Sequence, residues 1–297
     1  MRFVLLLVLL SSFLFSKVYK VGFAQDTLSN DWRIAQVNEV KREALKYPFL
    51  SLTIRDAKAN IATQISDLEY FIKEDYDFII TSPIDSFITS QVLKKAIDKG
   101  ISVILIDRGI DTDNYTTFIR PKNKSIAQKA ARFMVEKMNG EGTILMIEGI
   151  KGATPTIHRT VGFENITKKY PKIKIIKKRA NFLRADAIHV MEDVYKSGIE
   201  FDAIYSHSDS MLSGVRVVMD NLKKDMTLLM VGIDYIAESK EAILNNKQSA
   251  SFTYPTCGKE GIEAVVGIIN KKDVQKNILI KSKYIDKNNA LSVAPIF

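Results

Sequence analysis

The residues of this chain best suited to chemistry are carboxylates and guanidinium groups that stand directly after short apolar segments. Asp107 and Arg108 follow the segment Val103–Ile106, and Asp234 follows a similar segment later in the chain. A carboxylate accepts hydrogen bonds from hydroxyls, and an arginine fork donates several to hydroxyl or ring oxygens. The indole of Trp32 can cover the apolar face of a sugar ring. This combination favours a polyol over an apolar or strongly anionic ligand.

The predicted site consists of residues at or soon after the carboxyl ends of the expected strands, because ligands of doubly wound sheets bind there. Simpler roles are the alternative: a carboxylate at a strand end often caps the next helix, Trp32 could belong to a core, and Arg159 could lie on the surface. The predicted ligand-binding residues are Gln25, Asn30, Trp32, Arg33, Asp107, Arg108, Glu148, Arg159, Ser208, Asp209, Asp234 and Tyr254.

No arrangement typical of catalysis or of metal binding is found in the sequence. Cys257 is the only cysteine, and the three histidines stand at positions 158, 189 and 207. His189, with Glu192 and Asp193, is more typical of a solvated helix face than of a metal site. We therefore expect no catalytic residue, no metal and no cofactor. A hydrolase or isomerase is the rival class, because Asp/Arg pairs can transfer protons.

The elements that position these residues are short apolar runs alternating with amphipathic stretches. Short strands that alternate with longer helices are typical of βαβ units in a parallel sheet. The predicted strands are 18–24, 50–55, 78–81, 103–106, 143–148, 173–178, 203–206, 228–233 and 249–253. The predicted helices are 32–46, 61–73, 86–99, 125–138, 161–170, 185–196, 210–222 and 258–270.

A weak internal repeat predicts two lobes. The segment YDFIITS (76–82) resembles FDAIYSH (201–207), and each precedes a helix and then a strand followed by aspartate. We therefore expect two similar Rossmann-like α/β lobes, each with a parallel sheet flanked by helices. A single sheet of ten or more strands is the alternative. The first half ends near residues 117–122, where Pro121 interrupts the pattern.

Residues 1–16 are predicted to be a signal peptide, because Arg2 precedes an apolar run (3–15) too short to span a bilayer. An uncleaved anchor is the alternative, and no cysteine follows the run to carry a lipid. The 297 residues have a net charge of +9 from lysines scattered along the chain. The basic cluster or helix-turn-helix of a nucleic-acid binder is missing, so no nucleic-acid partner is expected.

Several separated stretches resemble the type I periplasmic sugar-binding proteins, the substrate-binding receptors of ABC transporters. The likeness is nearest to the galactofuranose binders of that family and more distant to its ribose binders. It extends from Lys20 to about Asn289. The matching stretches are VGFAQ and SNDWR (21–33), LIDRGID (105–111), EGIKGA with Arg159 (148–159), YSHSDSM (205–211) and VGID (231–234).

The resemblance implies an N-terminal lobe of residues 17–119 and 253–282 and a C-terminal lobe of residues 120–252 and 283–297. Three chain crossings, near Ile119, Phe252 and Lys283, would form a hinge, with the ligand in the cleft between the lobes. The residues at matching contact positions are Trp32, Arg33, Asp107, Arg108, Arg159, Asp209 and Asp234.

The resemblance also implies a monomeric periplasmic receptor that closes on a small carbohydrate and delivers it to an ABC permease. Presentation of the bound ligand to a histidine-kinase or chemotaxis sensor is the alternative. A regulator of transcription is disfavoured, because the signal peptide occupies the place of a DNA-binding headpiece. Ser208 stands where the family usually has Asn, Glu148 where close relatives have Gln, and His158 where they have an acidic or small residue. The ligand, furanose or otherwise, therefore stays open.

Overall fold

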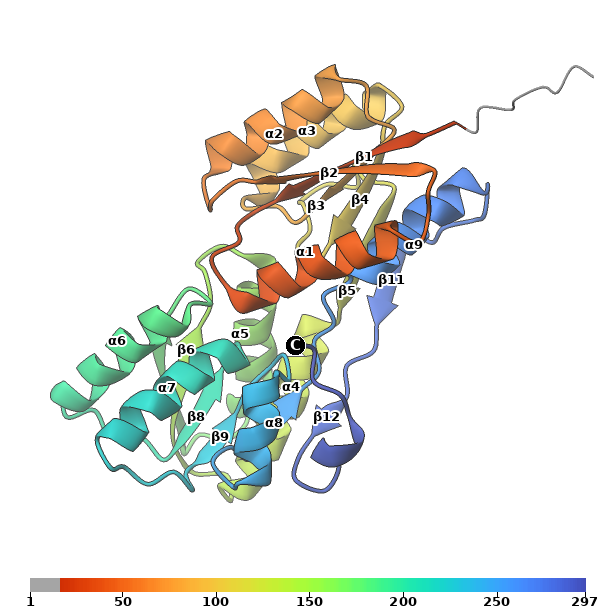
Figure 1. The fold of residues 1–297 in the computed structure, drawn as a ribbon. Coiled ribbons are helices and arrows are strands. Elements are labelled where there is room, and N and C mark those ends of the chain that lie inside the picture. Colours follow the sequence, from red (N-terminus) through yellow and green to blue (C-terminus); the bar gives the residue numbers. More distant parts are fainter. Residues whose placement is uncertain (1–16) are drawn as a thin grey trace, which may run out of the picture.

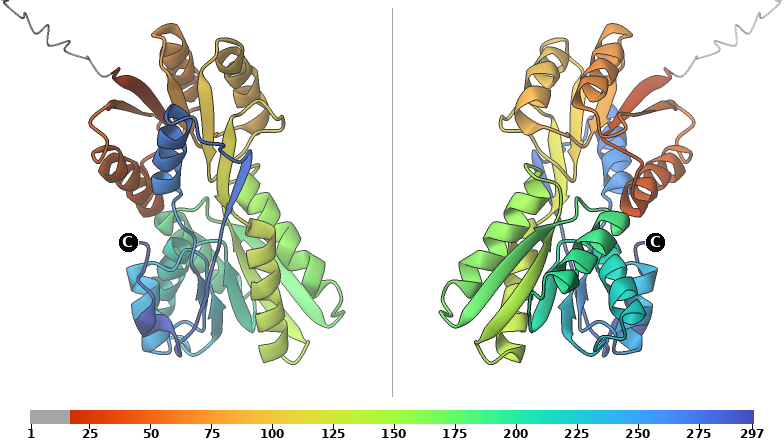
Figure 2. Two further views of the ribbon diagram at one scale, coloured as in Figure 1. Left: turned by 90° about the vertical axis from the view of Figure 1, so that its right-hand side faces the viewer. Right: turned by 90° about the vertical axis from the view of Figure 1, so that its left-hand side faces the viewer.

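The computed structural model describes residues 17–297, which form two α/β lobes (Figure 1). Each lobe contains a parallel sheet with helices on both faces, so the predicted doubled α/β architecture is confirmed. The late segments of the chain contribute to both lobes, as the blue elements in Figure 2 show. The predicted signal peptide, residues 1–16, lies outside the described residues.

The N-terminal lobe is built on a six-stranded parallel sheet with the strand order β11-β5-β4-β3-β1-β2. Helices α1 and α9 cover one face, and α2 and α3 cover the other. Covered on both faces, β3 is apolar along most of its length and fully buried. The strands are β1 (Tyr19–Gln25), β2 (Leu50–Asp56), β3 (Phe78–Thr81), β4 (Ser102–Ile106), β5 (Thr117–Pro121) and β11 (Asn277–Ile280), and the helices are α1 (Asp31–Ala44), α2 (Ile61–Lys73), α3 (Ser86–Asp98) and α9 (Gly258–Ile269).

The C-terminal lobe has a four-stranded parallel sheet with the order β7-β6-β8-β9. Helices α4 and α5 pack on one face, and α6 and α7 on the other. A short antiparallel pair, β10 with β12, lies beside it. The strands are β6 (Gly142–Glu148), β7 (Ile173–Arg179), β8 (Ala203–Ser206), β9 (Leu229–Val231), β10 (Ser251–Phe252) and β12 (Tyr284–Ile285), and the helices are α4 (Asn123–Lys137), α5 (Thr154–Thr167), α6 (Arg184–Lys196), α7 (Asp209–Asn221), α8 (Ala237–Leu244) and a 3-10 turn (Ala290–Ser292).

Three segments carry the chain between the lobes. They join β5 to α4, β10 to α9, and β11 to β12. The boundaries that we assign at 119/120, 252/253 and 282/283 lie at or close to these segments, although β5 continues to Pro121. Each lobe is therefore assembled from chain segments that are distant in the sequence.

Some elements differ from the prediction, and local chemistry explains the differences. β5, β11, β12 and α8 are not predicted. Pro121 interrupts the sequence pattern of the first, and the other three are short and partly exposed. Helix α5 begins at Thr154, well before the predicted start at 161. Its Pro155 stands in the first turn, where the missing N–H breaks no helical hydrogen bond.

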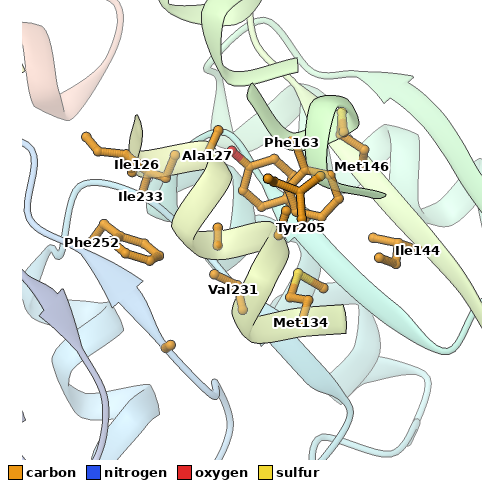
Figure 3. Packing of buried hydrophobic residues seen from close by; sticks show 14 of the residues in the cluster. Ile126, Ala127, Met134, Ile144, Met146, Phe163, Tyr205, Val231, Ile233 and Phe252 are labelled. Carbon is orange, nitrogen blue, oxygen red and sulfur yellow. The ribbon is translucent and has the colours of Figure 1, made fainter. Parts of the chain in front are cut away.

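The core of the C-terminal lobe contains a close aromatic stack (Figure 3). The rings of Phe163 on α5 and Tyr205 on β8 have centroids 4.1 Å apart and planes 11° apart. Both side chains are fully buried, with Ile126 and Met134 of α4 in the same cluster. Stacking therefore adds to the hydrophobic burial that holds α4 and α5 against the sheet.

Phe163→Ala should lower the free energy of unfolding by about 3–5 kcal/mol, because the lost ring leaves a cavity in a packed core. Phe87→Ala is the matched control, since Phe87 is 65% exposed on α3. We expect the control to change stability by no more than about 0.5 kcal/mol. Urea unfolding measures both, and equal effects in the two variants would contradict the packing described above.

Candidate ligand-binding cleft

The two lobes enclose a cavity of about 430 Å³. It lies where the carboxyl ends of the two sheets face each other, between the N-terminal end of α1 and those of α5 and α7. The lining residues are Asn30, Trp32, Arg33, Asp107 and Arg108 from the N-terminal lobe, Pro155, Arg159, Phe182, Ser208, Ser210 and Asp234 from the C-terminal lobe, and Tyr254 from a crossing segment.

A buried ion-pair network forms the N-terminal wall of the cavity. The Asp26 carboxylate lies 2.9 Å from Arg33 Nε and 2.8 Å from Arg108 Nη1. Arg33 Nη2 also lies 2.9 Å from Asp107 Oδ2. Burial works against the charge of Arg33, but Asp26 and Asp107 raise its pKa overall, whereas burial lowers the pKa of Arg108. Two carboxylates balance two guanidinium groups, so this wall needs no charged ligand.

Unusual backbone conformations aim two carboxylates into the cavity. Asp107 has φ +66°, and Asp234 has φ +121° and is followed by Tyr235 at +60°. Left-handed backbone costs about 1–2 kcal/mol for a residue with a side chain. Main-chain hydrogen bonds hold both aspartates, from Asp107 N to the Ile119 oxygen at 3.0 Å and from Asp234 N to the Phe252 oxygen at 2.9 Å. Backbone strain at cavity-lining carboxylates is typical of a functional site.

Tyr254 joins the two walls. Its hydroxyl donates to Asp107 Oδ1 at 2.7 Å and accepts from Asn123 Nδ2 at 2.9 Å. Trp32 Nε1 donates to its main-chain oxygen at 3.2 Å, and the Arg159 guanidinium lies 4.3 Å from its ring centroid. Burial, together with the neighbouring Asp107, raises the pKa of the Tyr254 phenol well above its usual value. The neutral phenol therefore links both lobes at physiological pH.

A second link between the lobes lies at the surface. Arg184, the first residue of α6, places its Nη2 3.1 Å from Asp31 Oδ2 at the start of α1. Its Nη1 lies 2.7 Å from Glu238 Oε1 of α8, within the C-terminal lobe. Glu238 thus orients the guanidinium that Asp31 contacts across the cleft. Exposed pairs of this kind contribute only about 0.2–1 kcal/mol.

The C-terminal wall carries polar groups that the protein itself leaves without partners. Within residues 17–297, the Asp234 carboxylate forms no ion pair and accepts no hydrogen bond from a side chain. The Ser210 hydroxyl is buried and likewise has no partner in that range. Arg159 is committed elsewhere, since its Nε donates to Asn123 Oδ1 at 2.8 Å and its Nη1 to the His207 carbonyl. This wall presents free hydrogen-bonding capacity to the cavity.

The structure brings most of the predicted ligand-binding residues into one place. Nine of the twelve line the cavity, from both lobes and the crossing segment. Asn30 also caps α1, because its side chain accepts a hydrogen bond from Arg33 N at 2.9 Å. The nine are Asn30, Trp32, Arg33, Asp107, Arg108, Arg159, Ser208, Asp234 and Tyr254.

Gln25 and Glu148 do not line the cavity, because their polar groups form hydrogen bonds with other side chains. Gln25 Nε2 donates to Gln36 Oε1 at 2.9 Å in the interior of the N-terminal lobe. Glu148 accepts hydrogen bonds from Thr160 at 2.8 Å and from Arg179 at 3.2 Å. The two side chains hold α1 and α5, respectively, near their sheets.

Asp209 also does not line the cavity; its contacts lie in the interior of the C-terminal lobe. Its carboxylate accepts hydrogen bonds from Tyr235 N at 2.7 Å, from Gln248 at 2.8 Å and from the Ser251 hydroxyl. It also fills the space over Gly232, where a Cβ would lie 1.8 Å from Oδ1. Asp209 therefore ties α7 to the segments around β9 and β10.

Four residues of the site are not among the predicted ones. Pro155, Phe182 and Ser210 line the cavity, and Asp26 holds both arginines behind it. Phe182 follows β7 in left-handed backbone, and its ring packs over Gly149, where a Cβ would lie 2.0 Å from the ring. The strand-end rule, that ligands bind after the carboxyl ends of strands, would have found Phe182 if it had been applied to apolar residues after β7 as well as to polar ones.

Other kinds of site were sought in residues 17–297. In that range no helix has the length and apolar character needed to cross a membrane. The same residues contain no group of three or more His, Cys, Asp or Glu side chains arranged to hold a metal ion.

Two parallel α/β sheets, three crossings and a polar cleft with aromatic walls define a type I periplasmic binding protein fold. The chain belongs to the family described as "periplasmic binding protein domain", which matches residues 21–273.

Individual proteins of known role are similar to nearly the whole chain. The ribose import binding protein RbsB of Bacillus subtilis is 28% identical over 88% of this chain and 85% of its own length. The galactofuranose-binding protein YtfQ of Escherichia coli is 29% identical over 82% and 79%. A solved structure, the fructose binding periplasmic domain of hybrid two component system BT1754, is 30% identical, with a TM-score of 0.86 and 92% of each chain covered.

Asp234→Asn should raise the melting temperature of the ligand-free protein at neutral pH. Burial raises the pKa of Asp234 well above its ordinary value, although Arg159 opposes the shift. A carboxylate with a raised folded-state pKa destabilises the fold when ionised, and this effect vanishes below its unfolded pKa of about 4. The advantage of the variant should therefore shrink as the pH falls towards that value. Melting curves at stepwise lower pH test this, and a pH-independent advantage would count against it.

Proposed function

We propose that this chain is a periplasmic receptor that binds one small, uncharged, polyhydroxylated molecule, a sugar, between its lobes. The observation that carries the proposal is the unpaired hydrogen-bonding capacity of a buried, charge-balanced cavity. Arg108 Nε is a buried donor without a partner among residues 17–297, and Asp234 supplies acceptors. Sugar hydroxyls both donate and accept, so they can satisfy both groups.

The aromatic residues of the cavity support a ring-shaped sugar. Trp32 and Tyr254 lie with ring centroids 5.8 Å apart, and Phe182 adds a third apolar surface. Aromatic faces pack well against the C–H face of a sugar ring. The relative that binds galactofuranose supports a furanose in particular.

We infer that binding proceeds by closure of the lobes and without chemical change. Each lobe supplies about half of the lining, so a bound sugar bridges them and favours the closed arrangement. The arginines of the N-terminal wall are paired with carboxylates rather than poised beside a nucleophile. Recovery of an incubated sugar in altered form would contradict a purely binding role.

Delivery of the bound sugar to an ABC permease is the favoured role, supported by the import receptor among the relatives. Sensing is a second candidate, because the similar fructose-binding domain is part of a hybrid two component system. A deletion strain separates the two roles. Loss of labelled-sugar uptake with unchanged induction of sugar genes supports import, and loss of induction with normal uptake supports sensing.

The ligand class is tested by thermal shift with a panel of D-ribose, L-arabinose, D-fructose, D-galactose, xylitol and myo-inositol. At least one of these should raise the melting temperature of the wild type, by an amount that grows with concentration above the dissociation constant. If none does, the proposed ligand class is contradicted.

Trp32→Ala should weaken binding of the stabilising sugar by about 30-fold or more, as expected for a buried aromatic at the centre of an interface. Because Trp32 also packs against Tyr254, each variant is compared with its own ligand-free melting temperature. Phe87→Ala, on an exposed position of the same lobe, is the control and should bind like the wild type. Equal binding by the Trp32 variant would remove this residue from the site.

A further inference from the structure

The contacts within the C-terminal wall do not explain the role of one polar group of the cavity, the hydroxyl of Ser210. Ser210 stands in the first turn of α7, lines the cavity and is 5% exposed. Its Oγ is buried and has no hydrogen-bond partner among residues 17–297. Buried hydroxyls are nearly always paired in folded proteins, so an unpaired one that faces a cavity requires a reason.

Helix capping does not supply that reason. Ser208 caps α7, because its Oγ accepts a hydrogen bond from Met211 N at 3.2 Å. The main-chain oxygen of Ser210 accepts a hydrogen bond from Ser213 Oγ at 2.8 Å, but this bond does not involve the Ser210 hydroxyl. The start of α7 is therefore complete without the Ser210 hydroxyl.

A second polar group of the same wall points to a shared task. Asp234 also lines the cavity, and the main-chain amide of Asp209, next to Ser210, lies close enough to the Asp234 carboxylate to oppose the rise in its pKa. The carboxylate and the hydroxyl therefore line the same cavity, with the hydroxyl in the first turn of α7. The ionised carboxylate only accepts hydrogen bonds, whereas the hydroxyl is a free donor.

We propose that Ser210 is a specificity-determining residue of the sugar site, where its hydroxyl and the Asp234 carboxylate bind a single ligand hydroxyl. The ligand hydroxyl donates its proton to Asp234 and accepts the proton of Ser210. A ligand with a hydrogen or a methyl group in place of this hydroxyl leaves both side chains unpaired in a buried site. The site therefore selects strongly against deoxy analogues. This inference rests on the proposed function and adds the hydroxyl that the C-terminal lobe recognises.

The test uses Ser210→Ala in the full-length mature protein, with the panel sugar that stabilises the wild type most. We expect a dissociation constant about 3- to 10-fold higher by titration calorimetry, as for one lost neutral hydrogen bond. The ligand-free melting temperature should stay the same or rise, because the deleted hydroxyl has no partner in the protein. A fall in that temperature would assign the hydroxyl a structural role and overturn the inference.

Ser239→Ala is the matched control. Its hydroxyl, on α8, is also fully buried and without a partner in residues 17–297, but Ser239 does not line the cavity. The control should bind the same sugar with unchanged affinity. A loss of affinity in both variants would mean that removal of any buried hydroxyl weakens binding, which contradicts a contact specific to Ser210.

Deoxy analogues identify the contact. Two pairs are compared: D-ribose with 2-deoxy-D-ribose, and D-galactose with D-fucose. The wild type should bind the parent sugar of each pair more tightly than its deoxy analogue. Ser210→Ala should reduce this preference in the pair whose missing hydroxyl is the one that contacts the start of α7. Unchanged affinity of Ser210→Ala for every panel sugar that binds the wild type contradicts the inference alone. Absence of binding by the wild type across the panel contradicts the proposed function, and the inference with it.

Discussion

The buried network of Asp26, Arg33, Asp107 and Arg108 is the interaction on which the cleft depends. Four charges lie in the interior of one lobe, an arrangement that is stable only because each charge has partners. Removing one member would leave its partner as a buried charge without compensation, which lowers the free energy of unfolding by about 3–5 kcal/mol. The network also holds Asp107 where the Tyr254 hydroxyl reaches it, so the crossing segment and the C-terminal lobe are placed by the same contacts.

The two walls of the cavity would contribute differently to the proposed recognition of a sugar. The N-terminal wall is an electrically balanced surface in which Arg108 Nε remains a free donor, so it favours neutral ligands that can accept a hydrogen bond. On the C-terminal wall, the Ser210 hydroxyl has no partner among residues 17–297, and the Asp234 carboxylate interacts there with a main-chain amide but pairs with no side chain, so both keep hydrogen-bonding capacity for a ligand. In the proposed mechanism, contact of the ligand with this second wall would favour the closed arrangement and so couple occupancy to closure. The pair Asp31–Arg184 adds a weaker, ligand-independent contact between the lobes.

The doubled fold and most of the site could be predicted from the sequence because both follow local rules. Alternating strand and helix patterns marked the lobes, and the strand-end rule placed nine cavity residues. It failed for Gln25, Glu148 and Asp209. Arg179 binds Glu148, and Gln248 and Ser251 bind Asp209, from positions distant in the sequence that local patterns do not reveal. Gln25 is bound by Gln36, which only the packing of α1 on the sheet brings beside it. Phe182 was missed because the rule was applied to polar residues, and β5 because Pro121 suggested a break where an edge-adjacent strand ends.

Trp32 has one more consequence, which is optical. It is the only tryptophan among the 297 residues, and it lies in the cleft with its indole N–H bonded to Tyr254 and the Arg33 guanidinium 4.9 Å from its ring centroid. All indole fluorescence of the protein therefore arises from the binding cleft. The lobe closure proposed above would change the polarity and charge around this indole, so the emission of the unlabelled protein would report that movement.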